Sequence, residues 1–226
     1  MTAMNETTAM ERPQGRGAAA TWFGLGIALF SLIIIRQAFR AISTEPGTGL
    51  VLAREACMFA SAAALLWIVR RGEQMPWSSI GMGTVRVWKS LVWGVAIAIA
   101  NVIPLAIIVK LTSYGQGPAS QAFAKLPLWV VFIVVVRAGV VEELFYRGYA
   151  ISRLQRMGFG KFAACQIPLA IFAVGHWTGG IANILIALVA GGIMTAFYLW
   201  RRDLAANMSG HFLVDFVGNI VPELFS

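Results

Sequence analysis

Three short polar motifs in an otherwise apolar chain contain the residue types that acid–base chemistry needs. They are EELFYR at 142–147, FAVGH at 172–176 and HFLVD at 211–215. A carboxylate and an imidazole together can activate a water molecule, and a second imidazole can stabilise a developing oxyanion. Glu142, His176, His211 and Asp215 are therefore the candidate catalytic residues of a hydrolase that uses no covalent nucleophile.

Helical spacing assigns different roles to the two adjacent glutamates. Glu143 and Arg147 are four residues apart and share a helix face, so we expect them to form an ion pair. Glu142 lies about 100° further round the helix and is expected to remain free. A free carboxylate beside a paired one provides one base and one fixed charge. Asp215 follows His211 by four residues and shares its face, so it is placed to orient the imidazole or to act on substrate.

The same residues allow a metal site as an alternative. Glu142, His176 and His211 would supply two imidazoles and a carboxylate to a divalent ion such as zinc, which would then activate the water. The HExxH signature of many zinc proteases does not occur in the chain. From the residues alone, both mechanisms remain open.

The composition predicts that these motifs lie inside a membrane. The 226-residue chain is 58% hydrophobic and only 12% charged, whereas soluble domains carry about a quarter charged residues. Its long apolar runs are continuous rather than alternating, which favours helices over barrel strands. We expect an all-α, polytopic transmembrane bundle of about seven helices (six to eight) with a polar intramembrane cavity. The expected segments are 18–35, 50–69, 90–109, 128–147, 162–178, 181–199 and 204–224.

Two features of these segments bear on the site. The stretch 148–157 has no helix breaker after its first glycine, so the fourth helix is expected to continue beyond 147, with Gly139 separating it from an upstream piece. This extension moves the glutamates toward mid-membrane, closer in depth to both histidines. Arg54 and Glu55 lie within the second segment and are expected to face the bundle interior, because charges are costly in lipid.

Basic residues predict the orientation. The net charge is +8, and twelve of the 18 Lys and Arg residues fall in stretches on one side of the membrane. Only Arg36, Arg40, Lys110 and Lys125 fall on the other side, so the N-terminus is expected to be cytosolic and the C-terminus outside. Membrane orientation thus explains the basic charge without nucleic acid as a partner. Residues 1–17 are expected to be a flexible cytosolic tail, and 18–226 a single transmembrane domain.

The three motifs, in this order, resemble the CPBP family of intramembrane proteases. That family includes the type II CAAX prenyl endopeptidases and the bacterial Abi proteins linked to bacteriocin processing or immunity. The resemblance covers 142–215 and implies a protease-like core at about 125–226. It implies that Glu142 is the general base, assisted by His176, and that His211 and position 215 form the oxyanion-stabilising side. Glu143, Arg147 and Phe172 would support the site.

Position 215 departs from the CAAX endopeptidases, which have Asn there. An ionised Asp cannot donate a hydrogen bond to an oxyanion, so Asp215 must be protonated, orient His211 or bind a metal.

Together these observations predict an intramembrane endopeptidase, with the bilayer and a protein or peptide substrate as its partners. The substrate would be membrane-associated or lipidated, a prenylated protein being one option, and the location would be a bacterial cytoplasmic membrane. The alternative is a non-catalytic immunity or scaffold protein on the same fold.

Overall fold

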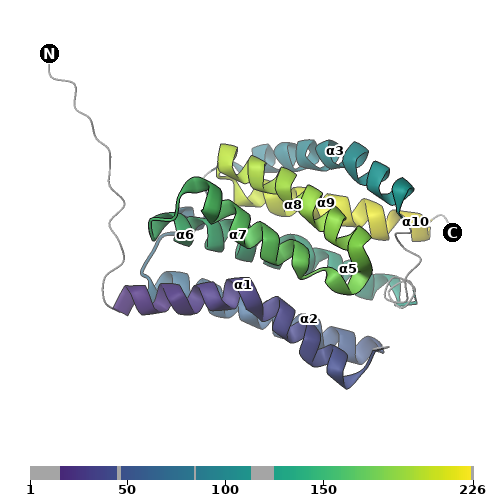
Figure 1. Ribbon diagram of the computed structural model, residues 1–226, viewed down its shortest axis with the longest axis horizontal. Helices are drawn as coiled ribbons and strands as arrows, with labels where there is room; N and C mark the ends of the chain where they lie inside the picture. The colour runs from purple at the N-terminus through teal and green to yellow at the C-terminus, as the bar shows by residue number, and fades with distance from the viewer. Residues whose placement is uncertain (1–15, 45–46, 84, 113–124, 225–226) are drawn as a thin grey trace, which may run out of the picture.

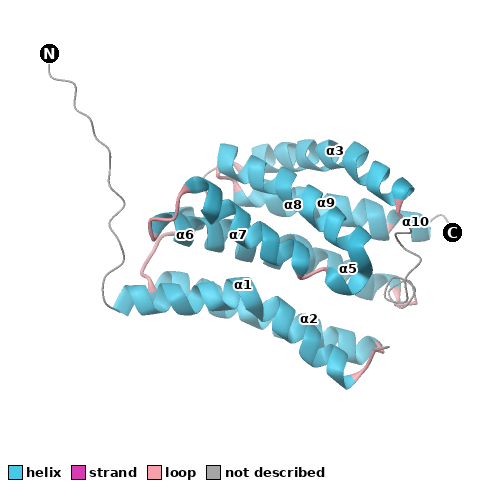
Figure 2. Ribbon diagram, viewed as in Figure 1, coloured by secondary structure: helices cyan, strands magenta, loops and turns pink. Residues whose placement is uncertain are grey.

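The computed structural model describes residues 16–44, 47–83, 85–112 and 125–224, and within these ranges all regular structure is helical (Figure 2). Most of the predicted cytosolic tail lies outside the described residues. Seven helical units correspond to the seven expected segments, so the prediction of an all-α bundle is confirmed. Four helices, Gly17–Ile42, Thr48–Gly72, Val87–Leu111 and Trp177–Arg201, are long and apolar enough to cross a membrane.

The helices are placed as follows along the chain. They are α1 (Arg16–Ile42), α2 (Thr48–Trp67) continued by η1 (Ile68–Gly72), η2 (Trp77–Ile80), α3 (Val87–Leu111), α5 (Leu128–Arg137), η3 (Ala138–Ile151), α6 (Ser152–Arg156), α7 (Lys161–Val174), η4 (Trp177–Gly179), α8 (Gly180–Arg201), α9 (Leu204–Asn219) and α10 (Val221–Leu224).

The η3 helix lies between two groups of helices (Figure 1). On one side, α1 and α2 pack against each other and against η3. On the other side, α3 packs on α8 and α9, and α9 contacts η3. The segment with the glutamate pair is therefore surrounded by protein, which is the position that ionisable residues require inside a membrane.

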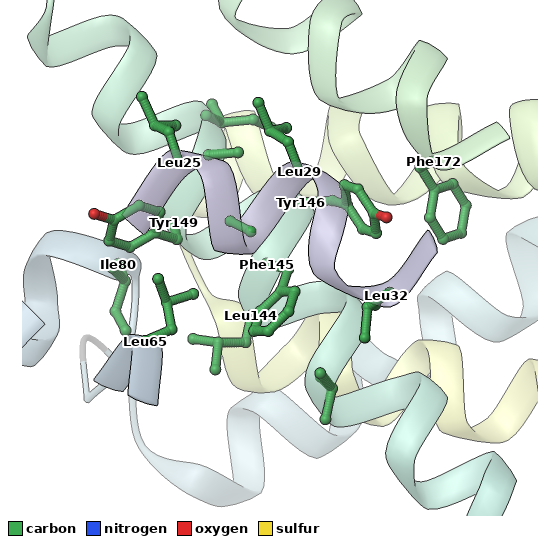
Figure 3. Close-up of a cluster of buried hydrophobic side chains, with 14 of the residues drawn as sticks. Leu25, Leu29, Leu32, Leu65, Ile80, Leu144, Phe145, Tyr146, Tyr149 and Phe172 are labelled. Atoms are coloured by element: carbon green, nitrogen blue, oxygen red, sulfur yellow. The ribbon is translucent and has the colours of Figure 1, made fainter. Parts of the chain in front are cut away.

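One apolar cluster joins α1, α2, η3 and α7. Figure 3 shows side chains of this cluster gathered around α1. The labelled members are Leu25, Leu29, Leu32, Leu65, Ile80, Leu144, Phe145, Tyr146, Tyr149 and Phe172. Lipid tails are as apolar as leucine, so close packing rather than removal from water stabilises contacts of this kind.

The fourth predicted helix continues past residue 147, as expected. From Leu128 to Arg156 the chain is helical without interruption, and its central part, η3, is wound as a π-helix. The expected separation at Gly139 is wrong. A Cβ atom at Gly139 would lie 3.0 Å from the Met208 carbonyl oxygen and 3.0 Å from the Phe212 nitrogen. Glycine is present here because η3 and α9 approach closely, not because the helix breaks.

A buried polar cluster fixes the other end of η3. The carboxylate of Glu73 accepts hydrogen bonds from Thr21 Oγ1 (2.8 Å), from the Tyr149 hydroxyl (2.8 Å) and from the Arg153 guanidinium (2.7 Å at the closest). Arg153 also donates to the Ser79 carbonyl oxygen. These bonds connect α1 and the loop after η1 to η3 and α6, and so set how far η3 reaches into the bundle.

Candidate active site

A cavity of about 690 Å³ lies in the bundle, and all four candidate catalytic residues line it. Glu142 comes from η3, His176 from the turn after α7, and His211 and Asp215 from α9. Three motifs that are far apart in the sequence therefore meet at one space. Apolar side chains, including valines of α5, also line the cavity.

Glu142 is not the free carboxylate that its helical position predicts. Its Oε1 atom accepts a hydrogen bond from Arg36 Nη2 at 2.5 Å and a second, very short one from Arg137 Nη1. The α-helical geometry correctly separates Glu142 from Arg147, but it does not predict the contacts with Arg36 of α1 or with Arg137, five residues earlier in the same helical stretch. Within the described residues, no side chain bonds to the second oxygen, Oε2, which leaves that oxygen available to water.

The arginines belong to a chain of ion pairs that extends to α2. Arg137 Nε donates to Glu55 Oε2 at 2.6 Å. Arg54 Nε donates to Glu55 Oε1 at 2.8 Å, and Arg54 Nη2 lies 2.7 Å from the same oxygen. We call the set Arg36, Glu142, Arg137, Glu55 and Arg54 the ion-pair chain. The expectation that Arg54 and Glu55 face the interior is confirmed, since Glu55 is buried and Arg54 lines the cavity.

Sequence reasoning missed the roles of Arg36 and Arg137. Arg36 was assigned to an external loop because the apolar run of the first segment ends at 35, but α1 continues to Ile42 and carries Arg36 inside the bundle. Arg137 lies within the apolar fourth segment. The rule that singled out Glu55, a charge inside an apolar run, also applies to Arg137 and would have found it.

Glu143 forms the predicted pair with Arg147, at 2.8 Å between Oε1 and Nη1. Both side chains are buried, and the arginine also donates to the Gly191 carbonyl oxygen. The same carboxylate accepts hydrogen bonds from His211 Nδ1 (2.8 Å) and Asn207 Nδ2 (3.2 Å). Glu143 is thus a fixed charge that joins η3 to α9, and it turns toward the protein rather than the cavity.

Both ring nitrogens of His211 face carboxylates. Nδ1 donates to Glu143, while Nε2 lies 3.6 Å from Asp215 Oδ2, so the two α9 residues do share a face as predicted. The shorter contact belongs to Glu143, which therefore does most to orient the ring. The Asp215 side chain is only partly buried and lies beside the cavity.

The expected segment 162–178 places His176 within a helix, and this prediction is wrong. The structure places His176 just beyond the end of α7, which stops at Val174. Its Nδ1 atom is 2.7 Å from the Phe172 carbonyl oxygen. A carbonyl oxygen only accepts hydrogen bonds, so Nδ1 carries the proton and Nε2 is left as an acceptor. The Phe172 ring packs against His176 and His211, with ring centroids 4.8 Å and 6.4 Å away.

The polar side chains at the cavity are the candidate ligands for a metal ion. Among the described residues, no three His, Cys, Asp or Glu side chains are grouped so that they could hold one. Glu142 already accepts from two guanidinium groups, whose positive charge disfavours a cation beside this carboxylate. In this arrangement these residues do not fit a metal site.

Residues 124–217 match the family model described as type II CAAX prenyl endopeptidase Rce1-like. The chain carries an Rce1-like domain. No curated protein and no solved structure matches the chain. The Rce1-like domain contains all three motifs, so the suspected relation to the CAAX proteases is confirmed. At the level of the family, this match supports a CAAX-type intramembrane protease that acts on a peptide substrate.

The matched segment does not include the whole site. The Rce1-like domain supplies Arg137, Glu142 and both histidines, but Arg36, Arg54 and Glu55 come from α1 and α2, which precede it. The first two helices therefore supply part of the cavity lining and three of the five members of the ion-pair chain.

Gly191 of α8 makes room for the buried arginine of the Rce1-like domain. A Cβ atom there would lie 2.7 Å from Arg147 Nη2 and 2.9 Å from Leu169 Cδ1. We expect Gly191→Ala to displace Arg147, to lower stability by about 1–3 kcal/mol and to reduce cleavage. Gly192→Ala is the matched control, because nothing lies within 4 Å of its Cβ position. Chemical unfolding in mixed micelles measures the difference, and equal stability of the two variants would contradict the assignment.

Proposed function

We propose that this protein hydrolyses a peptide bond of a membrane-associated protein or peptide, using a water molecule activated by Glu142 and His176. The observation that carries the proposal is that Glu142, His176, His211 and Asp215, from three separate segments, line one cavity inside the bundle. Such a convergence of costly ionisable groups within a membrane is typical of a functional site.

The two proposed proton acceptors, Glu142 and His176, are held in place by different neighbours. Arg36 and Arg137 stabilise the charged form of Glu142 and hold its Oε1, so that Oε2 is the oxygen that accepts from water. The Phe172 carbonyl fixes the His176 tautomer with Nε2 unprotonated. The water oxygen would add to the scissile carbonyl carbon while its proton passes to this acceptor pair. When the C–N bond breaks, the same proton would pass to the leaving amine.

The opposite side of the cavity would stabilise the negative charge that develops on the carbonyl oxygen. His211 is held by Glu143 through Nδ1, and Nε2 is the ring atom left to face a substrate beside Asp215. A ring held by a carboxylate on one nitrogen and donating from the other is a suitable oxyanion donor. Asp215 then serves to support the protonated ring rather than to donate itself.

We also propose that the N-terminus is cytosolic, on the distribution of Lys and Arg, and that a lipidated substrate, prenylated in the CAAX case, is one substrate class. The apolar wall of the cavity would receive apolar parts of such a substrate, and the polar wall would satisfy its extended backbone.

The ion pairing of Glu142 favours a second candidate function. A carboxylate bound to two guanidinium groups also suits a purely structural role, as in a non-catalytic immunity or scaffold protein that sequesters a partner. In such a protein, biological activity would persist in Glu142 and His176 variants.

His176→Gln separates the two functions, because the only hydrogen bond of this side chain within the described residues is to the Phe172 carbonyl. We expect wild-type protein, and not the variant, to generate new protein termini in membranes of an expressing host at equal expression, as measured by mass spectrometry. Repeating the assay with a chelator tests the zinc alternative. Identical terminus profiles for both proteins, with both correctly inserted, would favour the non-catalytic function.

A further inference from the structure

The ion-pair chain has more positive than negative charge. It contains three guanidinium groups, from Arg36, Arg137 and Arg54, but only two carboxylates, from Glu142 and Glu55. Of the other ionisable groups at the cavity wall, His211 and Asp215 lie 3.6 Å apart, and His176 bonds to the Phe172 carbonyl oxygen. Because an unpaired charge is costly inside a membrane protein, this excess calls for an anion when the site is occupied.

The excess charge is exposed at the two ends of the ion-pair chain. Arg137 is buried and bonded to both carboxylates, whereas the side chains of Arg36 and Arg54 are each 24% exposed and line the cavity. Arg54 donates from Nε to Glu55 and forms an ion pair with it through Nη2, and within the described residues its Nη1 has no bonded partner. A planar guanidinium with a free edge is well suited to bind a carboxylate.

Apolar side chains also line the cavity. They include Val131, Val134 and Val135 of α5 and Met194 of α8. A ligand that fills the cavity must therefore combine an apolar body with one anionic group.

We propose that Arg54, together with Arg36, forms a carboxylate-binding subsite that recognises an acidic group on an apolar peptide substrate. The inference rests on the proposed function for the identity of its ligand as a peptide. The carboxylate can come from the end of the peptide chain or from an Asp or Glu side chain, and the two sources share the same chemistry at the guanidinium. Arg54 is the cleaner residue to test, because it does not contact Glu142.

The test measures binding without requiring cleavage. The probes are N-acetyl-valyl-alanyl-leucine with a free carboxylate, its C-terminal amide, and the C-terminal amide of N-acetyl-valyl-alanyl-aspartate. The full-length protein is held in phosphatidylcholine nanodiscs, so that no anionic lipid competes, and affinity is measured by saturation-transfer NMR with the peptides verified to be intact. We expect wild-type protein to bind a carboxylate probe about tenfold more tightly than the uncharged amide. Preference for the first probe alone would identify the chain end as the ligand, and equal binding of the aspartate amide would identify any carboxylate.

Substituted proteins show which residue causes the preference for a carboxylate probe over the uncharged amide. Arg54→Gln is expected to abolish it, Arg54→Lys to retain part of it, and Arg71→Gln, which removes an exposed arginine of η1, to leave it unchanged. Equal affinity of wild-type protein for both carboxylate probes and the uncharged amide would overturn the proposal, even if Arg54→Gln fails to fold. So would a preference that survives in folded Arg54→Gln. If the protein shows this preference but generates no new protein termini, the carboxylate-binding subsite is supported and the proposed peptidase function is contradicted.

Discussion

Glu142→Gln is expected to lower the rate of peptide cleavage by roughly 10²- to 10⁴-fold, the range that general acid–base catalysis contributes. The amide keeps an oxygen that can accept from Arg36 and Arg137, so the helices should remain packed, but it cannot take a proton from water. The measurement is kcat on a substrate identified by its new terminus, with the purified protein in a bilayer.

Glu55→Gln is the matched control for this variant. It removes a buried carboxylate from the same ion-pair chain and leaves both hydrogen bonds of Glu142 in place. If Glu142 handles a proton, the control should lose far less activity. Equal losses in the two variants would show that the charge balance of the ion-pair chain, and not proton transfer, explains the effect.

Glu143→Leu is expected to act on folding, with a loss of about 3–5 kcal/mol in the free energy of unfolding. The Arg147 side chain is only 1% exposed, and without Glu143 its charge would be left buried beside a carbonyl and a hydroxyl oxygen. His211 and Asn207 would lose their acceptor at the same time. Unfolding by denaturant in mixed micelles measures the loss.

A second substitution distinguishes the stability cost of an unpaired buried charge from the cost of lost bonds and poor packing. Combining Glu143→Leu with Arg147→Met removes both charges and replaces them with apolar side chains, so the double variant should be more stable than Glu143→Leu alone. A double variant that is no more stable would mean that the lost bonds to α9, rather than the buried arginine, dominate. The adjacent glutamates are thus expected to differ sharply, one affecting the rate and the other the stability.

Local spacing predicted the contacts that lie within one helix. Glu143 with Arg147 and His211 with Asp215 are both four residues apart, and both pairs meet in the structure. The contact of Arg137 with Glu142 spans five residues, which in an α-helix places the two side chains about 140° apart. The segment between them is wound as a π-helix, in which residues five apart come to the same face. Nothing in the sequence indicated that winding.

Hydropathy patterns could not predict the contacts between helices, and the reason is a different one. The apolar run of the first segment ends before Arg36, so hydropathy assigned this residue to water, although α1 continues and Glu142 compensates its charge. His176 was placed in a helix because its segment is apolar, but α7 ends two residues earlier. Hydropathy reports the average environment of a segment and cannot report a single buried partner.

The division of the ion-pair chain between α1–α2 and the matched segment limits how this protein can be rebuilt or exchanged in parts. A hybrid that joins residues 124–217 to the leading hairpin of another membrane protein would bring Arg137 and Glu142 but leave them without Arg36, Arg54 and Glu55. Such a hybrid needs two arginines and a glutamate at the corresponding depths of its new hairpin. The ion-pair chain therefore has to be transferred as the α1–α2 hairpin together with the Rce1-like domain, and α3 has to accompany them because it packs on α8 and α9.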